Sequence, residues 1–199
     1  MKIVDVKTYV LSAPLAEPFA FSQGWVRARS AMLTEVVTDD GVSGWGEALC
    51  QGLQPPQIAA AVVEHALKPL LLGRDPLDVE VLWDLMYNQT KDYGQKGAVI
   101  GGISSVDIAL WDIIGQVHGV PVYKALGGAY RTCVKAYATG FYRRSEGTDL
   151  RGPWREEALG HIAAGFSGMK LKIGLGMKAD IQNVAAVREA IGPEPLLMV

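Results

Sequence analysis

The chain has 199 residues, a formal net charge of −2 and 49% hydrophobic residues, a composition typical of a globular protein. The near-neutral charge and the lack of a basic run argue against a nucleic-acid surface, and no uninterrupted apolar run is long enough to predict a membrane span. The two cysteines, Cys50 and Cys133, are far apart and lack metal-type spacing. We therefore expect a cytoplasmic protein with reduced thiols, bound to neither nucleic acid nor membrane.

The first part of the chain predicts a three-stranded antiparallel sheet. Partial alternation predicts a strand over 3–13, β-branched residues predict a second over 30–38, and an Asp-Asp-Gly turn leads into a third over 42–48. Residues 14–29 contain two prolines and a glycine, and they predict a long loop between the first two strands. Long ordered loops are often functional, so its aromatic residues would form either a lid or a packed plug. These residues are Phe19, Phe21 and Trp25.

A helical section follows, and then the pattern changes. Apolar residues at helical spacing predict helices over about 56–72, 76–92 and 97–118, and a Gly-Gly pair at 127–128 suggests a hinge. Beyond it, strands and helices alternate with short connections, which is typical of parallel βα units. The expected order is strand 134–139, helix 153–165, strand 168–174, helix 179–191 and a strand starting at 196. We predict one domain over 1–128 and a second over 129–199.

Two lysines share one face of the predicted strand over 168–174. Lys170 and Lys172 are two positions apart, so they point the same way, whereas Met169, Leu171 and Ile173 would face apolar packing. In a closed interior, two adjacent ammonium groups disfavour each other's charged form, and one amine could then act as a base near neutral pH. The alternative is an edge strand whose solvated lysines block pairing with other strands.

Three segments together resemble the mandelate racemase and muconate lactonizing enzyme group of the enolase superfamily. Residues 104–115, with the sequence SSVDIALWDIIG, are similar to the signature helix of that group. Lys170-Leu171-Lys172 resembles its lysine motif on the second barrel strand. Gly44-Trp45-Gly46-Glu47 resembles the end of its capping-domain hairpin. Gly102 and Ala125 depart from the usual pattern, but they concern helix packing.

The resemblance implies an enzyme that removes the proton beside a carboxylate. The fold would be an α+β capping domain over 1–128, followed over 129–199 by the start of a (β/α)7β barrel. Lys172 would be the base and Lys170 its neighbour. Mg²⁺ would stabilise the enediolate, but its ligands would fall after Val199, so none is expected in this chain. We expect a homo-oligomer that racemises, epimerises or dehydrates a small hydroxy acid or acid sugar.

Further residues are candidates for substrate binding. Tyr137 and Thr139 lie at the end of the first barrel strand, where barrel active sites gather. Glu47 would be either a lid-edge residue or a solvated carboxylate. Cys50 would line the pocket or pack as a small thiol. In similar proteins, the loop carrying Phe19, Phe21 and Trp25 closes over the site, and we expect it to be mobile without ligand.

Several other functions stay open at this point. Cycloisomerases and dipeptide epimerases share this half of the chain with the racemases. A Schiff-base aldolase could also use a neutral Lys172. Alternatively, this part would have no catalysis of its own and would serve assembly. The chain ends in an apolar run that reads as the start of a strand, so we expect it to be part of a longer protein.

Overall fold

The computed structural model describes residues 1–50 and 53–199, which divide into two compact units. The first unit contains Met1–Pro14 and Ala28–Tyr130. The second contains Leu15–Arg27 and Arg131–Val199. A short segment from the first two strands therefore belongs to the second unit, while the division into domains at residue 128 stays a prediction.

The predicted three-stranded antiparallel sheet is confirmed. Its strands are β1 (Ile3–Phe21), β2 (Gly24–Thr38) and β3 (Ser43–Ala48), in that spatial order. Strand β2 pairs antiparallel with β3, with Thr34 opposite Gly46. The central strand β2 thus carries one face of the sheet into the core of the first unit, where Met32, Thr34 and Val36 are fully buried.

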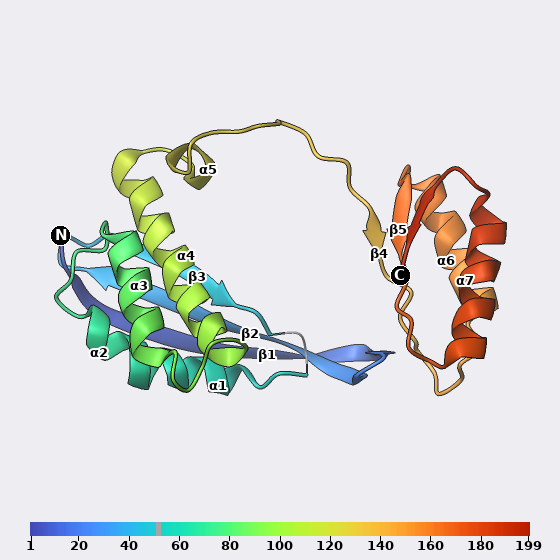
Figure 1. The fold of residues 1–199 in the computed structure, drawn as a ribbon, viewed down its shortest axis with the longest axis horizontal. Helices are drawn as coiled ribbons and strands as arrows, with labels where there is room; N and C mark the ends of the chain where they lie inside the picture. The colour runs from blue at the N-terminus through green and yellow to red at the C-terminus, as the bar shows by residue number, and fades with distance from the viewer. Residues whose placement is uncertain (51–52) are drawn as a thin grey trace. The chain divides into compact units, whose positions relative to one another are not determined.

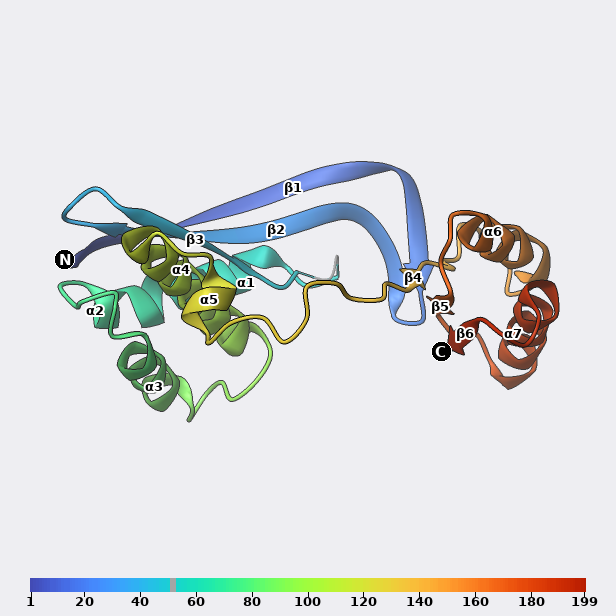
Figure 2. The same ribbon diagram turned by 90° about the horizontal axis from the view of Figure 1, so that it is seen from above.

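The prediction of a long loop over 14–29 is wrong. Strands β1 and β2 continue through it as one long hairpin, which closes in a two-residue turn at Ser22 and Gln23 (Figure 2). Gly24 follows the turn with a φ of 147°, a conformation that favours glycine. Strand β1 is an edge strand, where a proline without an N–H group is tolerated. We call Leu15–Arg27 the hairpin tip.

The helices predicted in the first unit are confirmed. The first predicted helix is a continuous run with a π-helical turn in its middle, and the helix over 97–118 begins one residue later than expected. The elements are α1 (Pro56–Ala61), η1 (Val62–Leu67), α2 (Lys68–Leu71), α3 (Val79–Thr90), α4 (Ala98–His118) and α5 (Val122–Ala125).

Helix α4 packs directly on strand β3 (Figure 1). Glycines permit this approach, because a Cβ added at Gly46 would lie 1.9 Å from the Ser105 carbonyl oxygen, and one at Gly44 would lie 2.0 Å from that of Ala109. Length and composition alone would let α4 cross a membrane. Its Ile103, Leu110 and Ile113 are nevertheless fully buried in the first unit, so we interpret α4 as a core helix.

The second unit contains the beginning of a parallel sheet. Its strands β4 (Ala138–Thr139), β5 (Gly168–Lys170) and β6 (Leu196–Met198) are ordered β4-β5-β6, and helices α6 (Arg151–Ala163) and α7 (Met177–Ile191) connect them (Figure 1). The predicted βα order is confirmed, although β4 and β5 are shorter than expected. Met169 and Leu171 are buried as predicted, but Ile173 is 38% exposed, because it lies beyond the end of β5 in the connection to α7.

Candidate active site

The lysine strand β5 is the middle strand of the parallel sheet, so the edge-strand alternative is wrong. Lys170 is paired with Thr139 of β4 on one side and Met198 of β6 on the other. The Leu171 N–H group then donates to the Met198 carbonyl oxygen at 2.9 Å. Lys172 follows this bond, at the carboxyl end of the sheet, where barrel enzymes place their catalytic groups.

The register places the candidate polar residues on one face of this sheet. Thr139 and Lys170 are directly opposite and therefore share a face, about 4.8 Å apart across the strands. Ala138 and Met169, one position earlier, are buried in the core on the helix side. Alternation puts Tyr137, which is 48% exposed, on the same side as Thr139. We call this side the lysine face.

The two lysines have no carboxylate partner in the part of the chain that the structure describes. Both side chains are half-buried, and neither takes part in an ion pair. An amine without a bound carboxylate is available for a ligand or for proton transfer. The Lys172 Nζ atom instead lies 5.8 Å from the centroid of the Tyr142 ring, within the range of a cation–π contact.

The hairpin tip contacts the same loop that carries Tyr142. Phe19 is 8% exposed and packs on Tyr142, with their ring centroids 4.4 Å apart. Two main-chain hydrogen bonds join Ala20 and Arg143, one of 2.7 Å and one of 3.0 Å. The guanidinium of Arg143 lies 5.4 Å from the centroid of the Trp25 ring. Of the aromatic residues predicted from sequence, Phe19 and Trp25 therefore contact the loop after β4. Phe21 and Trp25 are only half-buried.

An unusual backbone conformation shapes the loop after β4. Phe141 has a φ of 59°, which is rare for a residue other than glycine, and its side chain is fully buried. Its N–H group donates to Glu157 Oε1 at 2.8 Å, and its ring packs edge-on against Trp154. These contacts hold the strained residue in place and thereby fix the direction of the loop after β4, in which Tyr142 is the next residue.

Sequence reasoning missed Tyr142 and Arg143. Both follow a Gly-Phe pair at the carboxyl end of a predicted barrel strand, and loops at this end commonly carry active-site residues. That position was the available signal. Their contacts with the hairpin tip, however, join segments far apart in the sequence and could not be read from local pattern.

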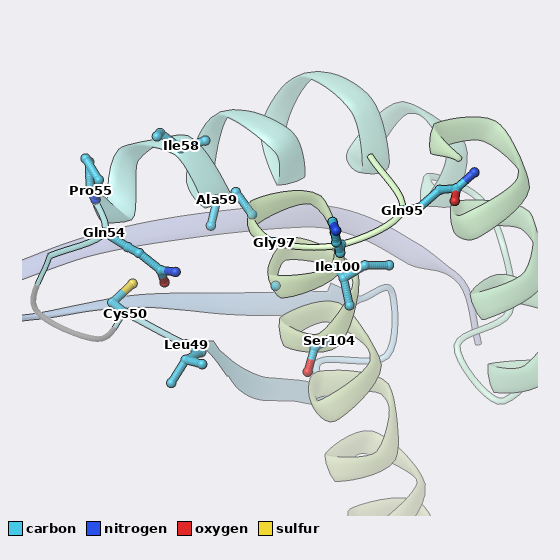
Figure 3. A pocket seen from close by; sticks show the side chains of 13 residues that line it. Leu49, Cys50, Gln54, Pro55, Ile58, Ala59, Gln95, Gly97, Ile100 and Ser104 are labelled. Atoms are coloured by element: carbon cyan, nitrogen blue, oxygen red, sulfur yellow. The ribbon is translucent and has the colours of Figure 1, made fainter. Parts of the chain in front are cut away.

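Glu47 and Cys50 lie in the first unit. Glu47 is an exposed residue of β3 and is paired with Leu33 of β2. Cys50 lines a pocket of about 480 Å³, with Gln54 beside it and Ile100 and Ser104 of α4 across from it (Figure 3). Burial raises the pKa of the Cys50 thiol, and the Glu47 carboxylate acts in the same direction. The thiol is therefore neutral near pH 7, and substrate binding by either residue stays a prediction.

No metal site is formed by the residues that the structure describes. Within 1–50 and 53–199, no three His, Cys, Asp or Glu side chains are grouped closely enough to hold an ion. The donors that Mg²⁺ prefers are several oxygen ligands at about 2.0–2.1 Å.

Comparison with known proteins gives a consistent match. Residues 3–127 match the family model described as the mandelate racemase/muconate lactonizing enzyme N-terminal domain. The D-galactarolactone cycloisomerase of Agrobacterium fabrum is 41% identical over 199 residues, which cover 100% of this chain and 51% of that protein. The arabinonate dehydratase of Saccharolobus solfataricus is 44% identical over 162 residues, which cover 81% of this chain and 42% of that protein.

A solved structure agrees with these matches. The crystal structure of the 3,6-anhydro-D-galactonate cycloisomerase from Zobellia galactanivorans is similar with a TM-score of 0.83 and 35% sequence identity. The match covers 100% of this chain and 50% of that chain. The chain thus spans about half the length of the relatives that it matches.

Proposed function

This chain belongs to the mandelate racemase/muconate lactonizing enzyme family, and from that premise we propose that it forms the capping domain and first barrel strands of an enzyme that abstracts an α-proton. The substrate would be a small carboxylate, either a hydroxy acid or an acid sugar. The observation that carries the proposal is the lysine face, where Lys170 and Lys172 lie at the carboxyl end of a central strand without a carboxylate partner.

The lysine pair supports one proton-transfer step. As a neutral amine, Lys172 Nζ would form a bond to the α-proton while the C–H bond breaks, and the electron pair would pass into the carboxylate to give an enediolate. A positive charge on neighbouring Lys170 would attract the substrate carboxylate and the negative charge that develops on it. Return of a proton to the other face gives racemisation or epimerisation, and loss of a β-hydroxyl group gives dehydration.

The ligands of a divalent cation would have to lie outside this chain. The described residues lack a suitable ligand cluster, and the relatives are about twice as long as the chain. We propose that Mg²⁺ ligands lie in the part of such a protein that this chain does not cover. When bound, the ion would stabilise the negative charge that develops on the substrate carboxylate.

A cycloisomerase is the second candidate function. The relative that matches this chain over its whole length at 41% identity is named a D-galactarolactone cycloisomerase, and the similar crystal structure is also of a cycloisomerase. In such a reaction, the same lysine pair would move the proton next to the carboxylate while a ring opens or closes. Product analysis by mass spectrometry separates this outcome from dehydration, because only dehydration removes a water molecule.

Other parts of the proposal follow from the family. Residues 1–128 would form the capping domain, with Glu47 and Cys50 at the edge of the site and with Phe19, Phe21 and Trp25 as part of a lid. Residues 129–199 would start the barrel, with Tyr137 and Thr139 facing the substrate. The complete protein would be a cytoplasmic homo-oligomer.

The test measures proton exchange in the complete protein that carries this chain. Lys172→Ala should abolish exchange of the substrate α-proton with solvent deuterium in at least one stereochemical sense, with an unchanged circular dichroism spectrum. Chelation with EDTA should also stop exchange, and Mg²⁺ or Mn²⁺ should restore it. Wild-type exchange in Lys172→Ala would place the base elsewhere. Trapping of a carbonyl substrate on Lys172 by borohydride would favour a Schiff-base aldolase instead.

A further inference from the structure

We propose that Tyr142 is a positioning residue, and that it holds the Lys172 amine in place and connects it to the hairpin tip. The inference rests on the proposed function of Lys172 as a base. Its starting point is the 5.8 Å contact between Lys172 Nζ and the Tyr142 ring, which joins two loops at the carboxyl end of the sheet.

The first step concerns the freedom of the lysine side chain. Lysine carries its amine on a flexible four-carbon stem, while a general base must stay within hydrogen-bond reach of the proton that it removes. In the part of the chain that the structure describes, the Lys172 amine has no hydrogen bond and no ion pair. The face of the Tyr142 ring is therefore the contact that limits where this amine lies.

The second step concerns what fixes the ring itself. Phe19 packs on one side of Tyr142, and the paired hydrogen bonds between Ala20 and Arg143 anchor the residue that follows. The residue that precedes it, Phe141, is buried and bonded to Glu157. Tyr142 is thus held from both sides along the chain and from the hairpin tip.

The third step concerns the approach of the hairpin tip to the lysine loop. Gly174, two residues after Lys172, has a φ of 105°, and a Cβ added there would lie 2.7 Å from Ser22 Cβ at the turn of the hairpin. The tip therefore contacts the loops after both β4 and β5. A movement of the tip would change the Phe19–Tyr142 contact, and through it the position of the amine.

The experiment uses the complete protein and compares three variants with the wild type. Tyr142→Leu removes the ring and should lower kcat for α-proton exchange by about tenfold or more with KM changed by less than about threefold, because small displacements of a catalytic group are costly. Tyr142→Phe keeps the ring face and should stay within about threefold of the wild type in kcat. Tyr130→Leu, which removes a fully exposed tyrosine, is the matched control and should have no effect.

A second variant tests the connection to the hairpin tip. Phe19→Leu should lower kcat in the same direction, and the Phe19→Leu/Tyr142→Leu double variant should lower it by less than the product of the two single effects, because both act through one contact. Nuclear magnetic resonance gives a readout besides activity. The ε-protons of Lys172 should show a ring-current shift in the wild type and in Tyr142→Phe, and this shift should disappear in Tyr142→Leu.

The outcomes separate this inference from the proposed function. Wild-type kcat and an unchanged Lys172 resonance in Tyr142→Leu, together with an inactive Lys172→Ala, would overturn the role of Tyr142 and leave the base assignment intact. Equal losses in Tyr142→Phe and Tyr142→Leu would overturn the ring contact in favour of the hydroxyl group. Exchange that persists in Lys172→Ala would overturn both. If Tyr142→Leu does not fold, Phe19→Leu and the Lys172 resonance decide the question.

Discussion

The sheets of the two units differ in how closely helices pack on them and in which residues they present. In the first, helix α4 closes on the sheet so tightly that Gly46 has no room for a side chain, and the buried hydroxyls of Thr34 and Ser105 are hydrogen-bonded to each other at 2.8 Å. In the second, two helices cover one face of the sheet, while the other face presents Lys170 and Thr139. Tight packing of a helix on a sheet therefore characterises the first unit, whereas the second presents the lysines that we propose as catalytic residues.

This difference predicts that substitutions in the two units change different quantities. Changes at the contact between α4 and β3 should lower the free energy of unfolding and leave the chemistry of the folded fraction unchanged. Changes on the lysine face or in the hairpin tip should alter catalysis more than stability. Four predictions test this separation.

The largest effect is expected from Gly46→Ala in the first unit. The new Cβ would lie 1.9 Å from the Ser105 carbonyl oxygen, so the helix or the strand must move. We expect a loss of more than about 3 kcal/mol in the free energy of unfolding, above the usual range for overpacking, because the clash is with backbone. Urea denaturation measures this loss.

The matched control lies in the second unit. Gly160 is in helix α6, and a Cβ added there meets no atom within 4 Å. Gly160→Ala should therefore stabilise the protein by about 0.5–1 kcal/mol through the unfolded chain and the helix propensity. A loss below about 1 kcal/mol for Gly46→Ala would show that α4 can shift on the sheet, and the contrast between the two units would then be weaker.

The second prediction concerns the lid. Trp25 is half-buried, and the guanidinium of Arg143 lies 5.4 Å from the centroid of its ring. If the hairpin tip excludes water from the site, Trp25→Ala should change kcat/KM by about tenfold, or change substrate preference, with little change in melting temperature. Kinetics on a panel of acid sugars and thermal unfolding measure both quantities.

Phe19 provides the comparison for the lid prediction. It is 8% exposed and packs on Tyr142, so Phe19→Ala should cost more stability than Trp25→Ala. A large drop in melting temperature in Trp25→Ala, with relative substrate preferences unchanged, would make the whole hairpin tip a structural plug. The lid interpretation would then be wrong.

The sequence predicted most of the fold, because its signals were local and periodic. The apolar spacing over 97–118 predicted helix α4 to within one residue. The alternation around Lys170 and Lys172 predicted a strand with one polar face. Glycines and an Asp-Asp-Gly turn marked the ends of elements whose backbone cannot continue.

The hairpin tip and Tyr142 could not be predicted in the same way. Pro14, Pro18 and Gly24 favour a loop locally, yet the chain continues as an edge strand whose tip is held by hydrogen bonds to Arg143. The significance of Tyr142 depends on Phe19 and Lys172, which approach it only in the folded chain. Contacts between segments far apart in the sequence leave no periodic pattern of residues from which they could be predicted.

The third prediction tests the electrostatic role of Lys170. Lys170→Met removes one positive charge from the lysine face, so a carboxylate substrate should bind more weakly there and KM should rise by about tenfold. Lys178→Met, on the exposed side of α7, is the control and should leave KM unchanged. An unchanged KM in Lys170→Met would remove Lys170 from this role.

The fourth prediction has the smallest expected effect on stability, and it concerns the exposed ion pair of Asp149 and Arg151 at the start of helix α6. Hydrogen bonds from the Arg151 guanidinium, and then from its backbone N–H group, lower the pKa of Asp149 from 3.8 to about 2. A carboxyl group whose pKa is lower in the folded state stabilises the fold above pH 3.8, and this contribution disappears as the pH falls towards about 2. Because both side chains are more than half exposed, solvent screens the pair, and Asp149→Asn should leave the melting temperature at pH 7 nearly unchanged.

Titration of the Asp149 carboxyl carbon by nuclear magnetic resonance should show a midpoint near 2. This midpoint should rise in Arg151→Met and stay the same in Arg155→Met, because Arg155 pairs with Glu189 instead. A large drop in melting temperature for Asp149→Asn would show that the second unit, like the first, depends on a specific contact for its stability.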